Sequence, residues 1–178
     1  MANPTQVKSP DEMLQQWKEF RKQVVDYLKS IPESEFQAAP EGGGWSPSQI
    51  AEHLYLTQWN MARAVPAILG GKVGLDGSEC VTIDYDSVEG EVLATGNADA
   101  PEVVIPSQNW DLTTSLEHLQ KAMDKAEKGV TGKTREQLEA RGIPHAIFGP
   151  VNLMDWMWIQ AYHEIRHLNA LKRKRGDA

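Results

Sequence analysis

The stretch Ser46-Pro47-Ser48-Gln49-Ile50-Ala51-Glu52-His53 decides how this chain folds. A serine at the N-cap, a proline at the first helical position and a glutamine at the third form a capping box, which is typical of the start of an α-helix. The same arrangement occurs at Ser9-Pro10-Asp11-Glu12. We therefore predict a first helix that begins after Ser9 and ends at Pro32, and a second that begins after Ser46 and runs to Leu69.

Two more helices are expected in the second half of the chain. Apolar residues recur at helical spacing over about 108–128, and Gly129 suits the position just after a helix end. The last helix is expected over about 152–173. Four long amphipathic helices predict an all-α protein. We expect a four-helix bundle that forms a single domain over residues 1–178, with a long connection between its second and third helices.

That long connection has an unusual composition. Eight acidic residues and one lysine lie between Gly70 and Ser107, so this segment accounts for the net charge of −7. Connections of such length in compact domains are usually functional covers or disordered. Within it, the alternating residues 81–85 predict a short strand. Between the third and fourth helices we expect a short helix over 134–140 and then a loop over 143–150.

The composition argues against several classes of protein. Apolar residues make up 40% of the chain and charged residues 24%, which is ordinary for a soluble globular protein. The acidic balance argues against binding to nucleic acid, and no apolar run approaches the roughly 20 residues of a membrane span. Cys80 is the only cysteine, and Met1–Pro10 lack the apolar region of a signal peptide. We therefore expect a cytoplasmic protein without membrane contact.

Three histidines lie on helix stripes that are expected to face the bundle interior. His163 and His167 are four residues apart, so they share one helical face, which also contains Gln160. His53 lies on the corresponding stripe of the second helix, together with Asn60. Burying an unpaired polar group costs on the order of 1–3 kcal/mol, so this clustering indicates a bound partner. A metal ion with open coordination positions fits three neutral imidazoles.

The last two histidines also belong to the pattern His163-Glu164-x-x-His167, the signature of zinc peptidases. Asp177 is the only possible ligand downstream. Either this pattern is no metal site, or the third ligand comes from upstream, and both alternatives weaken the peptidase interpretation. Two roles stay open for Glu164: a general base, or an ion-pair partner of a lysine or arginine on a neighbouring helix. Arg166 either contacts an anionic substrate group or forms a surface salt bridge.

The remaining candidates carry simpler expectations. Gln160 and Asn60 either contact the substrate and support the metal ligands, or are polar packing residues between helices. His118 is expected at the boundary of the third helix and His145 in a loop, both outside the metal site. Cys80 lies among carboxylates, which disfavour its thiolate, so the chain offers no cysteine nucleophile of its own.

Three segments in this order resemble the DinB superfamily of bacterial four-helix-bundle metalloproteins, which includes YfiT-like thiol transferases. They are residues 44–54 at the start of the second helix, residues 148–156 at the start of the fourth, and the terminal histidine pair. The resemblance implies one divalent metal ion per chain, nickel or zinc, held by His53, His163 and His167. The acidic connection is longer than those of the family, which leaves the substrate open.

The resemblance also implies an activity. Characterised relatives include transferases and isomerases that use low-molecular-weight thiols such as bacillithiol or mycothiol, and relatives are often dimers. We therefore expect a metal-dependent thiol S-transferase that acts on small electrophilic molecules, with the thiol as cosubstrate and a homodimer as the assembly. Two alternatives stay open: a metal-dependent hydrolase that uses activated water with Glu164 as base, and a non-catalytic, stress-related bundle that binds a metal or ligand.

Overall fold

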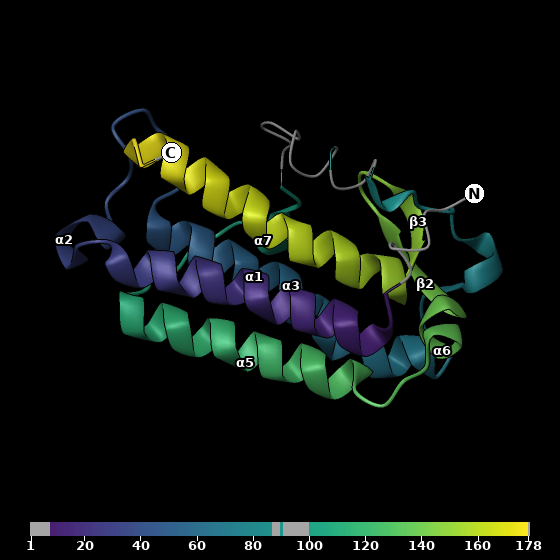
Figure 1. Cartoon of the computed structure of the whole chain (residues 1–178). Helices are drawn as coiled ribbons and strands as arrows, with labels where there is room; N and C mark the ends of the chain where they lie inside the picture. The colour runs from purple at the N-terminus through teal and green to yellow at the C-terminus, as the bar shows by residue number, and fades with distance from the viewer. Residues whose placement is uncertain (1–7, 87–89, 91–99, 178) are drawn as a thin grey trace.

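Four long helices form a bundle in the computed structural model, which describes residues 8–86, 90 and 100–177 (Figure 1). These helices are α1 (Pro10–Ser30), α3 (Pro47–Leu69), α5 (Leu112–Val130) and α7 (Leu153–Arg175). The helix α1 packs mainly against α7, and α3 packs mainly against α5. The first and last long helices are therefore neighbours, and the prediction of a four-helix bundle is confirmed.

The two predicted capping boxes start α1 and α3. Ser9 accepts a hydrogen bond from the backbone N–H of Glu12, and the Glu12 carboxylate accepts one from the N–H of Ser9. Ser46 and Gln49 make the same reciprocal pair. Each box satisfies two N–H groups that have no partner inside the helix, so the sequence alone locates both starts.

The ends of α5 differ from the expectation. The Asp111 side chain accepts a hydrogen bond from the N–H of Thr114, so the helix begins at Leu112 and not near residue 108. Gly129 lies inside the helix, where a Cβ atom would come within 3.2 Å of Val65. Its small size therefore serves the contact between α5 and α3, and the helix ends only at Val130.

A small antiparallel sheet lies at one end of the bundle, beside the short helix α6 (Arg135–Glu139) (Figure 1). Its strands, in spatial order, are β1 (Leu75–Asp76), β2 (Arg141–His145) and β3 (Gly149–Asn152). The short helix over 134–140 was predicted correctly, with Thr134 as its N-cap. The sheet was not predicted.

Two sequence-based expectations about this end of the molecule are wrong. Residues 143–150 form most of the β2–β3 hairpin and not a loop. In this hairpin Pro144 lies opposite Pro150. The sequence did not reveal the strands, because prolines are uncommon within a sheet. Residues 81–84 are not a strand. The N–H of Val81 donates to the carbonyl oxygen of Pro150 at 2.8 Å, which holds this irregular segment beside β3.

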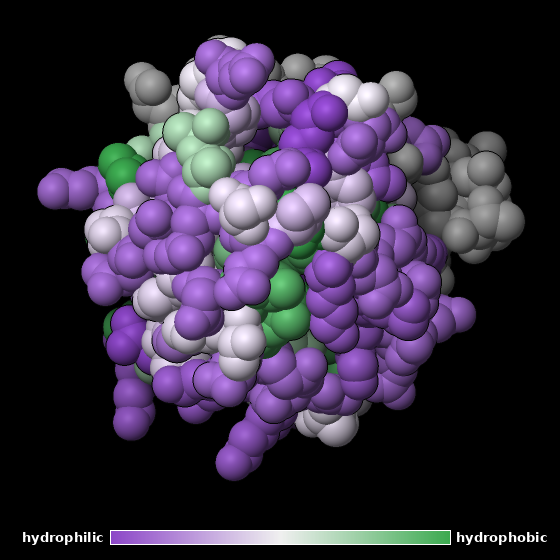
Figure 2. All heavy atoms as spheres, turned by 90° about the vertical axis from the view of Figure 1, so that its left-hand side faces the viewer, coloured by the Kyte–Doolittle hydropathy of each residue, from purple (hydrophilic) through white to green (hydrophobic). Residues whose placement is uncertain are grey.

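Two hydrophobic clusters fill the bundle, one toward each end. The cluster near the sheet includes Trp17 and Trp156, whose rings meet edge to face with centroids 5.4 Å apart. The other includes Leu28, Leu54 and Phe36, the last from the short helix α2 (Glu33–Phe36). The end of the bundle that carries α2 presents mostly hydrophilic residues, with a narrow strip of hydrophobic ones at its centre (Figure 2).

One buried arginine connects all four long helices. Arg21 of α1 donates from Nε to the carboxylate of Glu164 in α7 at 3.0 Å, and its Nη2 contacts the same carboxylate. It also donates to the side chain of Gln58 in α3 and to the carbonyl of Leu119 in α5, both at 2.8 Å. Trp17 adds a longer hydrogen bond to Glu164. Because the pair is 5% and 2% exposed, these bonds are shielded from water and fix how the helices meet.

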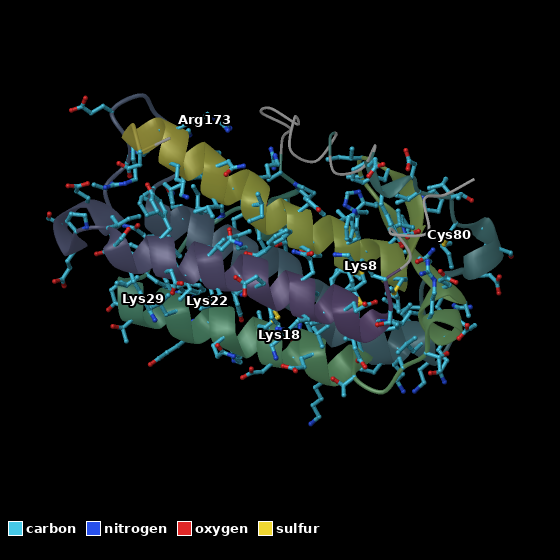
Figure 3. The ribbon with its side chains drawn as sticks, in the orientation of Figure 1. Lys8, Lys18, Lys22, Lys29, Cys80 and Arg173 are labelled. Atoms are coloured by element: carbon cyan, nitrogen blue, oxygen red, sulfur yellow. The ribbon has the colours of Figure 1, made fainter. Side chains whose placement is uncertain are left out.

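Within the described part of the chain, no helix combines the length and the apolar character that a membrane crossing requires. Charged side chains cover the outer faces of the helices, and the labelled lysines of α1 illustrate this (Figure 3). Lys18 pairs with Glu127 of α5 at 2.9 Å, and Lys22 pairs with Asp26 one turn further along α1. These exposed pairs contrast with the shielded pair of Arg21.

Candidate metal centre

Three histidines from two helices converge between α3 and α7. The Nε2 atom of His53 lies 3.4 Å from Nε2 of His163, which in turn lies 3.0 Å from Nε2 of His167. One possible ligand atom of each residue lies within 4.8 Å of the others. The structure therefore brings together the three residues that the sequence analysis selected, with their ring nitrogens facing one another.

The spacing of these nitrogens fits a divalent metal ion. Two nitrogens bound tetrahedrally to zinc at about 2.0–2.1 Å lie roughly 3.3 Å apart. The two distances at His163, 3.4 Å and 3.0 Å, are close to this value. Lone pairs that face one another across so short a gap repel unless a proton or a cation lies between them. A set of three imidazoles suits zinc or nickel better than magnesium or calcium, which prefer oxygen ligands.

A backbone carbonyl orients the ring of His53. Nδ1 of His53 lies 2.8 Å from the carbonyl oxygen of Val104, so the ring donates its Nδ1–H there. This contact leaves Nε2 without a proton, which is the form that a metal ion requires. Val104 belongs to the short 3₁₀ helix η3 (Glu102–Val104) within the long acidic connection. The sequence carried no signal for this contact, because any residue type supplies a carbonyl.

Burial keeps the three imidazoles neutral. It lowers the pKa of His53, although the hydrogen bond to Val104 opposes this effect. It lowers the pKa of His163 and of His167 well below the ordinary value, and the neighbouring histidines and Arg166 add to the shift. Because a metal ion binds only the neutral ring, the site is ready for a cation at neutral pH.

Aromatic and cationic side chains border the histidines. Trp45, just before α3, lies against His53 with ring centroids 4.7 Å apart and is stacked toward His167 at 6.4 Å. The guanidinium of Arg166 is half-buried, and its Nη1 lies 3.3 Å from Nε2 of His167. Burial lowers the pKa of Arg166. Nδ1 of His163 is buried, with no hydrogen-bond partner among the residues that the structure describes.

Glu164 does not take part in this cluster. Both of its carboxylate oxygens accept hydrogen bonds in the bundle core, from Arg21 and from Trp17. The structure shows the ion pair with an arginine of a neighbouring helix that the sequence left open. The role of Glu164 as a general base stays a prediction. The pattern of the zinc peptidases is present, but its glutamate is used for packing.

The two polar candidates have different positions. Gln160 is buried on α7 one turn before His163, and its role at the site stays a prediction. Asn60 contacts the long connection instead of the histidines, because its Nδ2 donates to the carbonyl of Val103 at 3.3 Å. Asn60 thus holds the residue next to Val104, and its role at the site stays a prediction.

The two remaining histidines lie outside the cluster. His118 stacks on Trp110 with ring centroids 4.0 Å apart, at the boundary of α5 as expected. His145 ends β2, and its Nδ1 accepts from the backbone N–H groups of Ile147 and Phe148. The sequence analysis expected it in a loop. The charge of the His145 ring is one of the effects that lower the pKa of His163.

Cys80 is at the sheet end of the molecule (Figure 3). Burial raises the pKa of its thiol, and the charges of Asp155, Glu79 and Asp76 raise it further. A thiol with a raised pKa is a poor nucleophile at neutral pH. The prediction that Cys80 is not a nucleophile agrees with this environment.

Fold and site together define a four-helix-bundle protein with a three-histidine centre. The sequence profile of the DinB superfamily matches residues 16–171, and the chain belongs to this superfamily. No curated protein matches the sequence.

Two solved structures share the fold. The four-helix bundle protein TT2238 is 22% identical, with a TM-score of 0.62 over 92% of this chain and 98% of its own. YfiT from Bacillus subtilis is 17% identical, with a TM-score of 0.61 over 99% of this chain and 94% of its own. YfiT is described as a probable metal-dependent hydrolase with an unusual four-helix bundle topology. At these identities, both comparisons support the fold alone.

Proposed function

We propose that this protein is a metal-dependent enzyme that transfers a low-molecular-weight thiol, of the bacillithiol or mycothiol type, to small electrophilic molecules. The observation that carries the proposal is the set of three neutral histidines, with His53 and His167 buried and His163 half-buried, whose Nε2 atoms face one another. His53, His163 and His167 would hold one zinc or nickel ion per chain. When bound, the ion supplies Lewis acidity, which lowers the pKa of a thiol or of water at its open positions.

The chain's own groups favour a thiol over water as the nucleophile. Activation of water in peptidases with this histidine pattern uses the glutamate as a base, and here Arg21 holds that glutamate in the core. A free thiol has a pKa of about 8.5, far below that of water, so a thiol ionises near neutral pH without a protein base. Arg166 offers a positive charge beside His167 to an anionic group of the thiol or the electrophile.

A metal-dependent hydrolase is the second candidate. It is favoured by the description of YfiT as a probable metal-dependent hydrolase, since that protein shares the fold. It would use the same three histidines, and an assay with and without thiol separates the two activities. Turnover that requires the thiol supports the transferase, and turnover without it supports the hydrolase. Bound metal with neither activity supports a non-catalytic bundle.

The metal content of the purified protein tests the centre itself. We expect about one divalent ion per chain in the wild type and its loss in His53→Ala and in His163→Ala, because each removes a ligand. His118→Ala is the matched control, since His118 is a histidine outside the cluster, and it should keep the ion. Elemental analysis of the four proteins gives the answer. Unchanged metal in both ligand variants would overturn the assignment.

A further inference from the structure

The acidic connection is fastened to α3 beside the first metal ligand. Glu52 directly precedes His53 and is 1% exposed. Its carboxylate accepts hydrogen bonds from the backbone N–H groups of Ser107 and Gln108, both at 2.8 Å, and of Asn109 at 3.3 Å. Successive N–H groups that point to one centre form an anion-binding concavity. Here the anion is a side chain of the same protein.

The geometry of this attachment requires a carboxylate. All three partners are donors, and a carboxylate offers only acceptors, whereas an amide would present an N–H₂ group to at least one of them. Asn109 has a φ of +49°, a conformation that non-glycine residues rarely adopt, and it brings the third N–H to Glu52. A buried carboxylate is tolerated when charge-assisted hydrogen bonds replace its water.

Residues 103–110, which we call the strap, are held to α3 at both ends. At one end, Asn60 binds the carbonyl of Val103. At the other, the hydroxyl of Ser48 donates to the carbonyl of Trp110 at 2.6 Å, and Glu52 holds the N–H groups between. Between Val104 and Ser107 the chain contains a proline, whose φ is fixed. The position of the Val104 carbonyl is therefore set by residues of α3.

We infer that Glu52 is a positioning residue of the metal centre: it fixes the strap so that the carbonyl of Val104 holds His53 in the tautomer that exposes a bare Nε2. Without that carbonyl, His53 also populates the tautomer with a proton on Nε2. That proton would point at Nε2 of His163, 3.4 Å away, and occupy the place of the metal ion. The inference rests on the proposed metal centre and assigns a role to the acidic connection.

The substitution Glu52→Gln in the full chain tests this role. We expect zinc affinity to fall about tenfold or more, because loss of the groups that orient a histidine ligand typically has effects of this size. Competition with a chromophoric chelator measures the affinity. In the metal-free protein, nitrogen NMR of the imidazole rings should show His53 change from the Nδ1–H form to a mixture. Zinc affinity within about twofold of the wild type, with the Nδ1–H form retained, would overturn the inference.

Two controls separate this role from general destabilisation. Glu127→Gln makes the same chemical change in an exposed pair and should leave both readouts unchanged. Leu138→Ala removes a fully buried side chain of α6 and should lower stability without changing the tautomer. If Glu52→Gln does not fold, Asn60→Ala loosens the other end of the strap at a half-exposed position and should weaken zinc binding. Unchanged zinc binding in Asn60→Ala would then count against the inference.

Different measurements test the role of Glu52 and the proposed metal centre. Failure of the wild type to bind zinc or nickel would overturn the metal centre. The tautomer of His53 in the metal-free protein would still report whether Glu52 and the strap orient this ring.

Discussion

His163 is surrounded by groups that resist its protonation. Burial is the main cause of its lowered pKa, and His167, His53 and Arg166 contribute further. The unfolded chain has no such restriction, and its histidines titrate near the ordinary value of 6.5. Below that pH, His163 binds a proton in the unfolded chain but stays neutral in the native protein. The free energy of unfolding of the metal-free protein therefore falls as the pH decreases through this value.

This difference predicts the pH dependence of stability. Between roughly pH 7.5 and pH 5.5, metal-free wild type should lose more stability than His163→Gln, which has no proton to accept at this position. Urea unfolding of both proteins at the two pH values measures the difference. His118→Gln should behave like the wild type. Equal losses in the wild type and His163→Gln would show that the burial of His163 has no such effect.

Individual residues of the site differ in how visible they are in the sequence. His53, His163 and His167 could be found because each is a polar residue on a stripe that otherwise packs inward. The role of Glu164 could not be decided, because the choice depended on whether an arginine of another helix lay within reach. Val104 was invisible, since it acts through its carbonyl. Sequence patterns reveal side-chain chemistry, but they do not show backbone ligands or partners.

Among the secondary-structure elements, the hairpin of β2 and β3 depends on a glycine. A Cβ atom on Gly142 would lie 2.2 Å from Sγ of Cys80 and 2.5 Å from the carbonyl oxygen of Val151. The second of these atoms belongs to the backbone of the partner strand and cannot move away without disturbing the sheet. Close approach of the chain, and not a special backbone angle, explains the glycine here.

We therefore expect Gly142→Ala to destabilise the protein by about 1–3 kcal/mol, the usual effect of overpacking a filled site. Gly42→Ala is the matched control, because nothing lies within 4 Å of its Cβ position and it does not require a left-handed backbone. It should change the free energy of unfolding by less than about 1 kcal/mol. Urea denaturation measures both. Equal stability of the two variants would contradict the described packing of the sheet.

The elements themselves were predictable to the extent that their signals are local. Reciprocal caps at Ser9 and Ser46 involve side chains three residues apart, so the starts of α1 and α3 could be found from the sequence. The sheet could not, because β1 and β2 pair across a wide separation and Pro144 and Pro150 weaken the local pattern. The strand expected at 81–85 had the right alternation, but residues 81–84 are irregular although the N–H of Val81 bonds to Pro150 of β3.

For the whole molecule, the central interaction is the buried pair of Arg21 and Glu164. Arg21→Met should destabilise the protein by about 3–5 kcal/mol, because it leaves the charge of Glu164 buried without an opposite charge. The double variant Arg21→Met/Glu164→Met should recover most of that loss, since neither charge remains. Urea unfolding of both single variants and the double variant completes the cycle.

The exposed pair Lys18–Glu127 supplies the control, because it also connects two helices. Its removal by Lys18→Met and Glu127→Met should cost less than about 1 kcal/mol, since water screens the charges. Additive effects of Arg21→Met and Glu164→Met would contradict the coupling that the structure shows.

The bundle could be predicted from the periods of its helices, but the identity of the neighbouring helices could not. Amphipathic stripes indicate that four helices share a core, and several arrangements satisfy them equally. The hydrogen bonds of Arg21 to Glu164, Gln58 and Leu119 distinguish the observed arrangement from the others. These hydrogen bonds connect residues that are far apart in the sequence, so no local pattern predicts them.

Residues that meet in the bundle lie far apart along the chain, and this affects the order in which the protein folds. His53 precedes His163 by 110 residues, and Arg21 precedes Glu164 by 143. Contacts between such distant positions form only after the ends of a long loop have met, which makes them late events in folding. A partly folded chain with α1, α3 and α5 in place has only His53 of the three clustered histidines in position. In the proposed centre, all three histidines can hold an ion only after α7 has docked, so a bound ion would mark a chain whose last helix is in place.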